Sequence, residues 1–217
     1  DKETKLSVSP ESFERQMKFL HDRKYNVVGL DKIMSYLRKE EKTPPKTVAI
    51  TFDDGFYNNY KYAYPVLKKY NLPATIFVIT DKIGSEGFLG PDQIKEMSGS
   101  GLITIGSHTM SHCWLPDADD AKLSKELSGS KEALEGVIGG GVKFLCYPLG
   151  AHDGRVQEAS RKAGYSAAVA TNPGISMRAD DIFAIKRIRI SRTSDNLFVF
   201  WVETSGYYTW MKEHRDE

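Results

Sequence analysis

Apolar positions along the chain follow two alternating patterns, helical spacing and short continuous runs. Ser9 and Pro10 are typical of an N-cap and a first helical position, and apolar residues at helical spacing continue to about Arg23. Short runs rich in β-branched residues predict strands at 27–30, 47–52, 74–79, 102–105, 142–147, 167–170 and 184–190. Helical spacing and capping signals between these runs predict further helices. One is capped by Asp31 and ends at about residue 37, and others cover 60–70, 121–137 and 156–163. Two more begin at Pro91 and at about Asn196.

Strands and helices thus alternate along the whole chain, which is the pattern of a parallel sheet joined by helical crossovers. A barrel and a doubly wound sheet both satisfy this pattern, and both place functional residues at the carboxyl ends of strands. Polar candidates follow three different strands, at Asp53, His108 and Pro148, and this clustering favours the barrel. With 217 residues and no low-complexity linker, we expect a single domain over 1–217.

Charge and composition narrow the classes of partner. The chain has 30 Lys and Arg against 29 Asp and Glu, so its net charge of +1 does not predict a nucleic acid or an anionic membrane as partner. No apolar run approaches the ~18 residues that span a bilayer.

The chain begins at Asp1 without an apolar signal core, and we expect a mature or trimmed piece of a longer protein. Cys113 and Cys146 are too few for a disulfide scaffold and are expected to be free thiols.

Asp53-Asp54-Gly55 directly follows the predicted strand at 47–52. Asp-Gly is common turn chemistry, so a plain turn is one interpretation. Adjacent carboxylates leaving a buried strand also repel each other unless a cation lies beside them. A metal ion meets that need, and a metal site is the second interpretation.

His108 and His112 lie four residues apart, a spacing that puts both imidazoles on one face of a helical turn. Such a pair also occurs by chance on surfaces. Two histidines and one carboxylate form a catalytic zinc ligand set with open positions for water and substrate, and aspartates follow a neighbouring strand. The zincin motif is excluded, because Thr109 stands where that motif has glutamate. Cys113 points off the histidine face, and we expect a buried inert thiol there.

Pro148-Leu149-Gly150 ends the predicted strand at 142–147. Proline and glycine commonly mark turns, so this segment is open to a purely structural interpretation. The alternative is that a rigid turn presents the backbone N–H of Leu149 to an oxyanion, a role in which the side chain matters little.

Three motifs in this order resemble those of the polysaccharide deacetylases of carbohydrate esterase family 4, the NodB homology domain: Thr51-Phe52-Asp53-Asp54-Gly55, His108-Thr109-Met110-Ser111-His112 and Tyr147-Pro148-Leu149-Gly150. The resemblance extends over about 47–190, and the segments 8–13 and 27–30 resemble the lead-in of the branch that deacetylates poly-N-acetylglucosamine. It implies an α/β fold, a distorted (β/α) barrel with about seven parallel strands, and a divalent metal, usually zinc. By match to the motifs, Asp54, His108 and His112 would be the metal ligands and Asp53 the catalytic base.

The implied reaction is hydrolysis of N-acetyl groups from an N-acetylglucosamine-containing polysaccharide. A metal-bound water would be the nucleophile, Asp53 would take its proton, and the oxyanion would lie between the metal and the Leu149 amide. Trp114, Tyr147 and Pro148 lie in or next to these motifs, and we expect them to contact the sugar. The aromatic residues of the tail are expected mostly to pack along a helix: Phe198, Phe200, Trp201, Tyr207, Tyr208 and Trp210.

The chain departs from the family pattern at the general acid, which must protonate the leaving amine. Many members supply a histidine from a late Leu-x-His motif, whereas the last histidine of this chain, His214, lies in a charged tail and is expected to be solvated. In the branch that this chain resembles, the corresponding histidine precedes the residues that match Val8. We therefore expect the acid to lie upstream of Asp1. His152 is the local alternative, and its competing interpretation is a polar loop residue without a catalytic role. On that hypothesis the domain over 1–217 lacks an N-terminal segment.

A second departure concerns the partner of the base. The arginine that usually precedes the family's Pro-x-Gly is replaced by Cys146. Arg187, in the last predicted strand, could instead hold Asp53 ionised and oriented. A solvated basic strand is the competing interpretation.

Three functions remain open at this point. The first is a metal-dependent polysaccharide N-deacetylase that acts outside the cytoplasm, a location inferred from the family's substrates alone. The second is an amidase for a small or peptidic substrate at the same metal centre. The third is a glycan-binding domain with reduced or lost turnover. The polymer, the metal and the oligomeric state cannot be read from the sequence.

Overall fold

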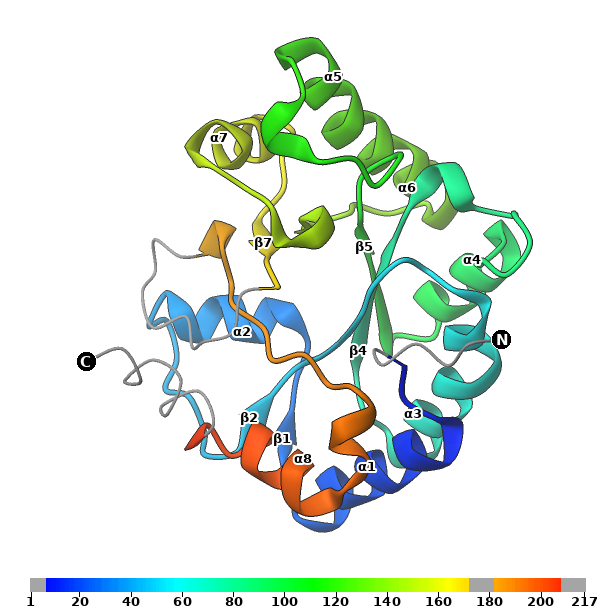
Figure 1. Ribbon diagram of the computed structural model, residues 1–217, viewed down its shortest axis with the longest axis vertical. Helices are drawn as coiled ribbons and strands as arrows, with labels where there is room; N and C mark the ends of the chain where they lie inside the picture. The colour runs from blue at the N-terminus through cyan, green and yellow to red at the C-terminus, as the bar shows by residue number, and fades with distance from the viewer. Residues whose placement is uncertain (1–6, 172–181, 208–217) are drawn as a thin grey trace.

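The computed structural model describes residues 7–171 and 182–207, and in them a parallel sheet curls into a half-barrel with helices around it (Figure 1). The sheet has five strands in the order of the sequence, every pair parallel: β3 (Ile50–Phe52), β4 (Ala74–Val78), β5 (Ile103–Ser107), β6 (Phe144–Cys146) and β7 (Ala167–Val169). β1 (Asn26–Val27) and β2 (Thr47–Val48) form a separate parallel pair. The predicted α/β fold of barrel type is confirmed.

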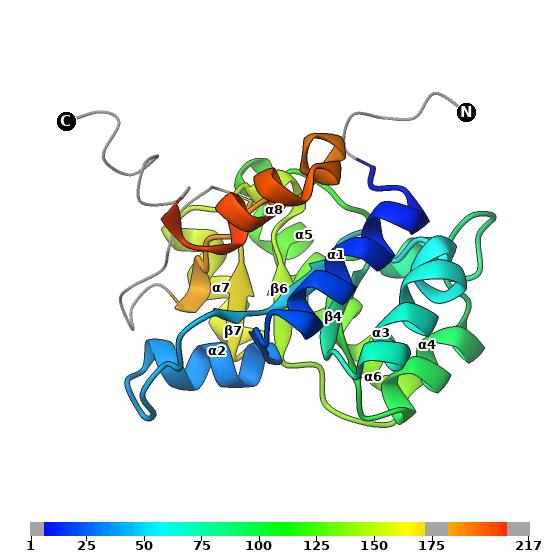
Figure 2. The same ribbon diagram turned by 90° about the horizontal axis from the view of Figure 1, so that it is seen from below.

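The helices lie outside the strands, as Figures 1 and 2 show together. Their bounds are α1 (Pro10–Asp22), α2 (Leu30–Leu37), α3 (Tyr64–Tyr70), α4 (Pro91–Gly99), α5 (Asp120–Ser124), α6 (Ser130–Ile138), α7 (Gly154–Lys162) and α8 (Leu197–Thr204). The cap of α1 is the predicted one, because the Ser9 side chain accepts a hydrogen bond from the Ser12 amide and Pro10 opens the helix. α8 lies beside α1, so the two ends of the described chain pack together (Figure 2).

Three local predictions are wrong in detail. The run 47–52 is not one strand, because it changes partner: Thr47–Val48 pairs with β1, and Ile50–Phe52 pairs with β4. The predicted strand 184–190 is reduced to a single parallel bridge between Ile185 and Val169. Asp31 is not the cap of α2, which begins at Leu30 after Gly29.

The sheet buries both of its faces, as expected of parallel strands. Its outer face packs against the helices in the main apolar core, to which β4 contributes Ala74, Ile76 and Val78. Its inner face carries a smaller cluster that α2 covers through Leu30 and that includes Phe77, Phe144, Cys146 and Val169. In the described part of the chain, no helix is long and apolar enough to cross a membrane.

Gly106 of β5 is required by close packing. A Cβ atom at this position would lie 2.6 Å from two ring atoms of Phe77 and 3.1 Å from the carbonyl oxygen of Phe144. We predict that Gly106→Ala lowers the free energy of unfolding by about 1–3 kcal/mol, because a packed inner face has no room for a methyl group. The measurement is urea unfolding. The matched control is Gly136→Ala in α6, where nothing lies within 4 Å and the change should be neutral or stabilising. Equal stability of the two variants would contradict the prediction.

Candidate active site at the carboxyl ends of the strands

The three sequence motifs meet at one end of the half-barrel. Asp53 and Asp54 directly follow β3, His108 directly follows β5, and the Tyr147–Gly150 segment follows β6. Because all these strands are parallel, their carboxyl ends lie at one edge, where barrel folds place their sites.

Asp54, His108 and His112 bring their ligand atoms together. Oδ1 of Asp54 lies 3.5 Å from Nε2 of His108 and 3.7 Å from Nε2 of His112. Ligand atoms around a tetrahedral zinc ion are separated by roughly 3.3 Å, given metal–ligand bonds of about 2.0–2.2 Å. The three side chains therefore fit a divalent ion of this kind.

His108 is oriented for such a ligand role by its other ring nitrogen. Nδ1 donates a hydrogen bond of 2.8 Å to the carbonyl oxygen of Cys146, which leaves Nε2 as the unprotonated nitrogen that faces Asp54. The ring is buried, and burial lowers the pKa of His108 and so favours the neutral imidazole. Neutral imidazole is the form that binds metals.

The histidines do not share a helical turn, contrary to the spacing argument. Residues 108–114 form a loop in which Thr109 and His112 have left-handed φ values of 64° and 61°. A β-branched residue at positive φ is a backbone outlier, and the loop compensates locally. The Thr109 hydroxyl accepts a hydrogen bond from the His112 amide at 3.0 Å. This turn brings the two imidazole rings together, with their centroids 4.7 Å apart.

The adjacent aspartates serve different partners. Asp54 and Gly55 have positive φ values of 70° and 74°, so the chain turns sharply at the end of β3. A side chain at Gly55 would lie 3.1 Å from Val78. Asp54 faces the histidines, whereas Asp53 faces Arg187.

Arg187 holds Asp53 through two parallel hydrogen bonds, Nη1 to Oδ1 at 2.7 Å and Nη2 to Oδ2 at 2.8 Å. Its remaining N–H groups reach the Ala170 carbonyl, the Thr51 hydroxyl and the Cys146 sulfur at 3.1 Å each. The guanidinium is therefore not a solvated surface group. Burial raises the pKa of Asp53, but the hydrogen bonds and charge of Arg187 outweigh burial and hold the pKa below its ordinary value.

Cys146 completes this contact. Its thiol donates to Oδ1 of Asp53 over 3.6 Å and accepts from Arg187. Burial, followed by the charge of Asp53, raises the pKa of the Cys146 thiol well above its ordinary value. Both cysteines are free, as predicted; Cys146 is buried, and Cys113 is only partly buried.

The segment after β6 is held in a strained turn. Leu149 has a φ of 56°, and its side chain is 65% exposed. The turn is fixed on both sides, because the Gly150 amide donates to the Tyr147 carbonyl and the Thr171 hydroxyl donates to the Leu149 carbonyl.

Two of the side chains predicted to contact the sugar are buried, which corrects that prediction. Tyr147 is 0% exposed, and Pro148 is also buried, so neither side chain offers a surface to a ligand. The Tyr147 ring belongs to the main core and stacks on His152 at 4.9 Å. His152 donates through Nδ1 to the Gly150 carbonyl at 3.0 Å. Trp114, by contrast, is 49% exposed.

Sequence reasoning missed two further features near the motifs. Phe56 and Tyr57, directly after Gly55, are exposed, and the Phe56 ring stacks on Phe88 at 5.0 Å. The signal was present, since aromatic residues follow the Asp-Asp-Gly motif. Glu126 is buried and binds the loop between the histidines. Burial raises the pKa of Glu126, while hydrogen bonds from Ser111 and Met110 outweigh burial and lower it.

The remaining candidates lie elsewhere. His21 is exposed on α1, while His214, Tyr208 and Trp210 lie outside the described residues. Among the tail aromatics that are described, Phe200 is buried as expected, but Phe198, Trp201 and Tyr207 are exposed.

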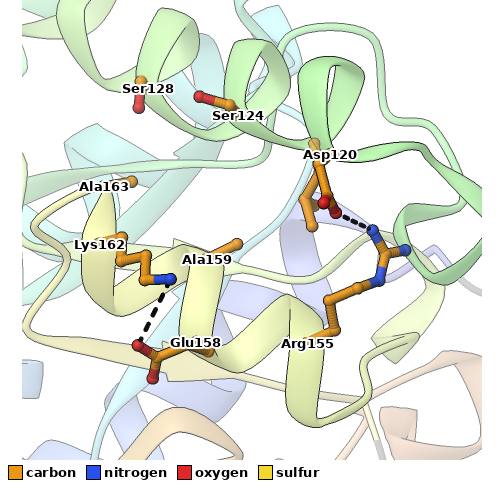
Figure 3. A pocket seen from close by; sticks show the side chains of 9 residues that line it. Asp120, Ser124, Ser128, Arg155, Glu158, Ala159, Lys162 and Ala163 are labelled. Atoms are coloured by element: carbon orange, nitrogen blue, oxygen red, sulfur yellow. Dashed lines mark hydrogen bonds and ion pairs between the residues drawn. The ribbon is translucent and has the colours of Figure 1, made fainter.

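A groove of about 380 Å³ lies between α5 and α7 (Figure 3). It is lined by charged side chains of both signs and contains the ion pair between Asp120 and Arg155. None of the predicted site residues lines it.

Fold and site together define a (β/α)-barrel protein with a polar centre at the carboxyl ends of its strands. A family model described as polysaccharide deacetylase matches residues 40–168, more than half of the chain. The chain belongs to the polysaccharide deacetylase family. The resemblance found in the motifs is confirmed.

Similar proteins agree with this assignment. YxkH of Bacillus subtilis, named as a polysaccharide deacetylase, is 37% identical over 86% of this chain and 66% of its own length. A poly-β-1,6-N-acetyl-D-glucosamine N-deacetylase of Staphylococcus aureus is 35% identical over 73% of this chain and 59% of its own length. The solved deacetylase PplD of Streptococcus pyogenes, in complex with acetate, has a TM-score of 0.83 and 30% identity, with 90% of this chain and 88% of that chain covered. The chain thus spans less than two thirds of the first two relatives.

We predict that Arg187→Ala lowers the free energy of unfolding by about 1–3 kcal/mol, because the partly buried Asp53 carboxylate would lose the two hydrogen bonds and the charge of its partner. The same substitution in an Asp53→Asn background should cost less, with a coupling free energy of about 0.5–3 kcal/mol. Urea unfolding of the four proteins measures this coupling. Arg189→Ala is the control, because Arg189 is exposed on the same segment. Additive effects would show that the pair does not stabilise the fold.

Proposed function

We propose that this protein is a divalent-metal-dependent N-deacetylase of a polysaccharide that contains N-acetylglucosamine. The observation that carries the proposal is the convergence of Asp54, His108 and His112, with the ring of His108 fixed by the Cys146 carbonyl. Two histidines and one carboxylate leave positions open for water and substrate, as catalytic zinc sites do. Zinc is the metal that this donor set favours.

When bound, a divalent ion would supply Lewis acidity, lowering the pKa of a bound water to about 7 and polarising the acetamide carbonyl. The chain's own residues supply the rest. Asp53 is kept ionised by Arg187 and takes the proton of the attacking water at Oδ2, which retains a lone pair beside its bond to Arg187, whereas Oδ1 accepts from both Arg187 and Cys146. The amide of Leu149, in the turn after β6, would stabilise the oxyanion.

Within the described chain, we propose His152 as the local candidate for the general acid. Its Nδ1 donates to the Gly150 carbonyl, which leaves Nε2 as the ring nitrogen that would act on the leaving amine. Its place three residues beyond Leu149 puts it on the same loop as the proposed oxyanion donor.

The substrate class follows from the relatives and from the surface. The Staphylococcus aureus relative is named for poly-β-1,6-N-acetyl-D-glucosamine. Exposed Phe56, Tyr57 and Trp114 lie within three residues of the proposed base or ligands and offer apolar faces on which sugar rings can pack. Such a polymer lies outside the cytoplasm, and we propose the same location for this protein.

The two alternatives are an amidase for small or peptidic substrates and a glycan-binding domain without turnover. Acetate release from N-acetylglucosamine oligomers, measured together with bound metal, separates the three functions. Acetate from the oligomers supports the proposal, and acetate only from other amides supports the amidase. Bound metal without acetate supports the binding domain.

Two single substitutions test the proposed roles. We predict that Asp53→Asn keeps the metal but lowers turnover by about 10²–10⁴-fold, because the water loses its base. Asp54→Asn should lose the metal itself, because a carboxylate ligand is removed. Metal content and acetate release are measured on both variants. Full turnover in Asp53→Asn would show that Asp53 is not the base.

We predict that Phe56→Ala raises KM for the oligomers by about 5–30-fold and leaves kcat nearly unchanged, since about 1–2 kcal/mol of apolar contact would be lost from binding. Tyr62→Ala is the control, because Tyr62 is a similarly exposed aromatic residue farther along the chain. An unchanged KM in Phe56→Ala would remove this residue from the substrate contacts.

A further inference from the structure

The helical segment that follows the histidine loop changes its winding at one place. α5 and α6 are joined by a π-helical turn, Lys125–Gly129, and such turns are rare and often lie at functional sites. Glu126 lies in this turn, and its side chain is buried. A buried carboxylate is retained only where it finds partners.

The backbone and hydroxyl donors to Glu126 come from the short segment between the two histidines. Oε2 accepts hydrogen bonds from the amides of Met110 and Ser111, both at 2.9 Å. Oε1 accepts a hydrogen bond from the Ser111 hydroxyl at 2.5 Å. Three donors on two neighbouring residues therefore converge on one carboxylate, and bonds to such a group are stronger than those between neutral groups.

These bonds hold a loop whose backbone is strained. Thr109 and His112 both have positive φ, a conformation that non-glycine residues keep only where their surroundings impose it. The same loop is held at its carbonyls, because the Thr80 and Asp81 amides donate to the carbonyls of Thr109 and Met110 at 3.2 and 3.0 Å. The loop is thus clamped by two segments of the chain, and Glu126 is the clamp from the helix.

The position of His112 depends on this clamp. His108 is held by β5 and by the Cys146 carbonyl, whereas His112 is partly exposed and stands at the far end of the clamped turn. We infer that Glu126 is a positioning residue that fixes the 109–112 turn so that the imidazole of His112 meets Asp54 and His108. This inference rests on the proposed metal site and concerns how the site is built.

The experiment compares Glu126→Gln with Glu135→Gln. Glu135 is a matched control, because it lies in the next helix, α6, and also accepts a backbone amide, that of Val142 at 2.9 Å, away from the histidine loop. Affinity for Zn²⁺ is measured on folded protein by competition with a chromophoric chelator, and the visible spectrum of bound Co²⁺ reports the ligand geometry. We expect Glu126→Gln to weaken affinity about 10–100-fold and to alter the Co²⁺ spectrum, as loss of a supporting partner does in metal sites. Glu135→Gln should leave both unchanged.

Ser111→Ala removes one of the three bonds and serves if Glu126→Gln does not fold. It should weaken Zn²⁺ binding less than tenfold, in the same direction and with the same spectral change. Unchanged affinity and spectrum in a folded variant would overturn the inference, because a merely structural role for Glu126 affects unfolding alone. Failure of the unsubstituted protein to bind Zn²⁺ would overturn the proposed metal site itself, so the two failures are distinct.

Discussion

The ion pair between Arg187 and Asp53 joins the two edges of the half-barrel. The five-stranded sheet begins at β3 and ends at β7, and a closed barrel would need these edges to pair. The segment after β7 makes one backbone bridge, at Ile185, and then places Arg187 across the gap. Its Nε binds the Ala170 carbonyl beyond β7, while its Nη1 binds Thr51 and Asp53 at the end of β3. A single planar side chain thus does locally what a ladder of backbone hydrogen bonds does elsewhere, and it does so at the edge where the polar residues gather.

Backbone strain is concentrated at the same edge. Of the eight described non-glycine residues with positive φ, four belong to the motifs: Asp54, Thr109, His112 and Leu149. Each follows the carboxyl end of a strand, where the chain must turn before a helix can begin. Strained conformations persist only where their surroundings impose them, and here the imposing groups are identifiable. They are the tight packing at Gly55, the bonds of Glu126 and the bonds on both sides of Leu149.

The alternation of strands and helices, and the edge at which the motifs meet, could be predicted because both depend on local pattern and on parallel connection. The failures arise where partners are distant in sequence. Residues 184–190 have the composition of a strand, but within the described ranges only Ile185 forms a strand bridge, to Val169. The four-residue spacing of His108 and His112 is compatible both with a helical turn and with a strained loop, so the spacing alone could not distinguish them. Tyr147 shows a missed signal, since strand alternation puts Phe144 and Cys146 on the inner face and so turns Leu145 and Tyr147 toward the outer core. Glu126 carried no local signal, because its partners lie 15 and 16 residues away.

Cys146 contacts the site through its backbone carbonyl and through its side-chain thiol, and these two contacts are chemically independent. Its carbonyl fixes His108, and any amino acid at this position would offer the same oxygen. Its thiol touches Asp53 and Arg187, and that part alone changes when the residue is exchanged. The position is therefore free to vary in one half of the site while the other half stays constant. A cation for Asp53 can accordingly be supplied from this strand or, as in this chain, from a segment 41 residues later, without disturbing the histidine that the backbone holds. An exchange of the side chain at position 146 would therefore change the surroundings of Asp53 and leave the hydrogen bond to His108 in place.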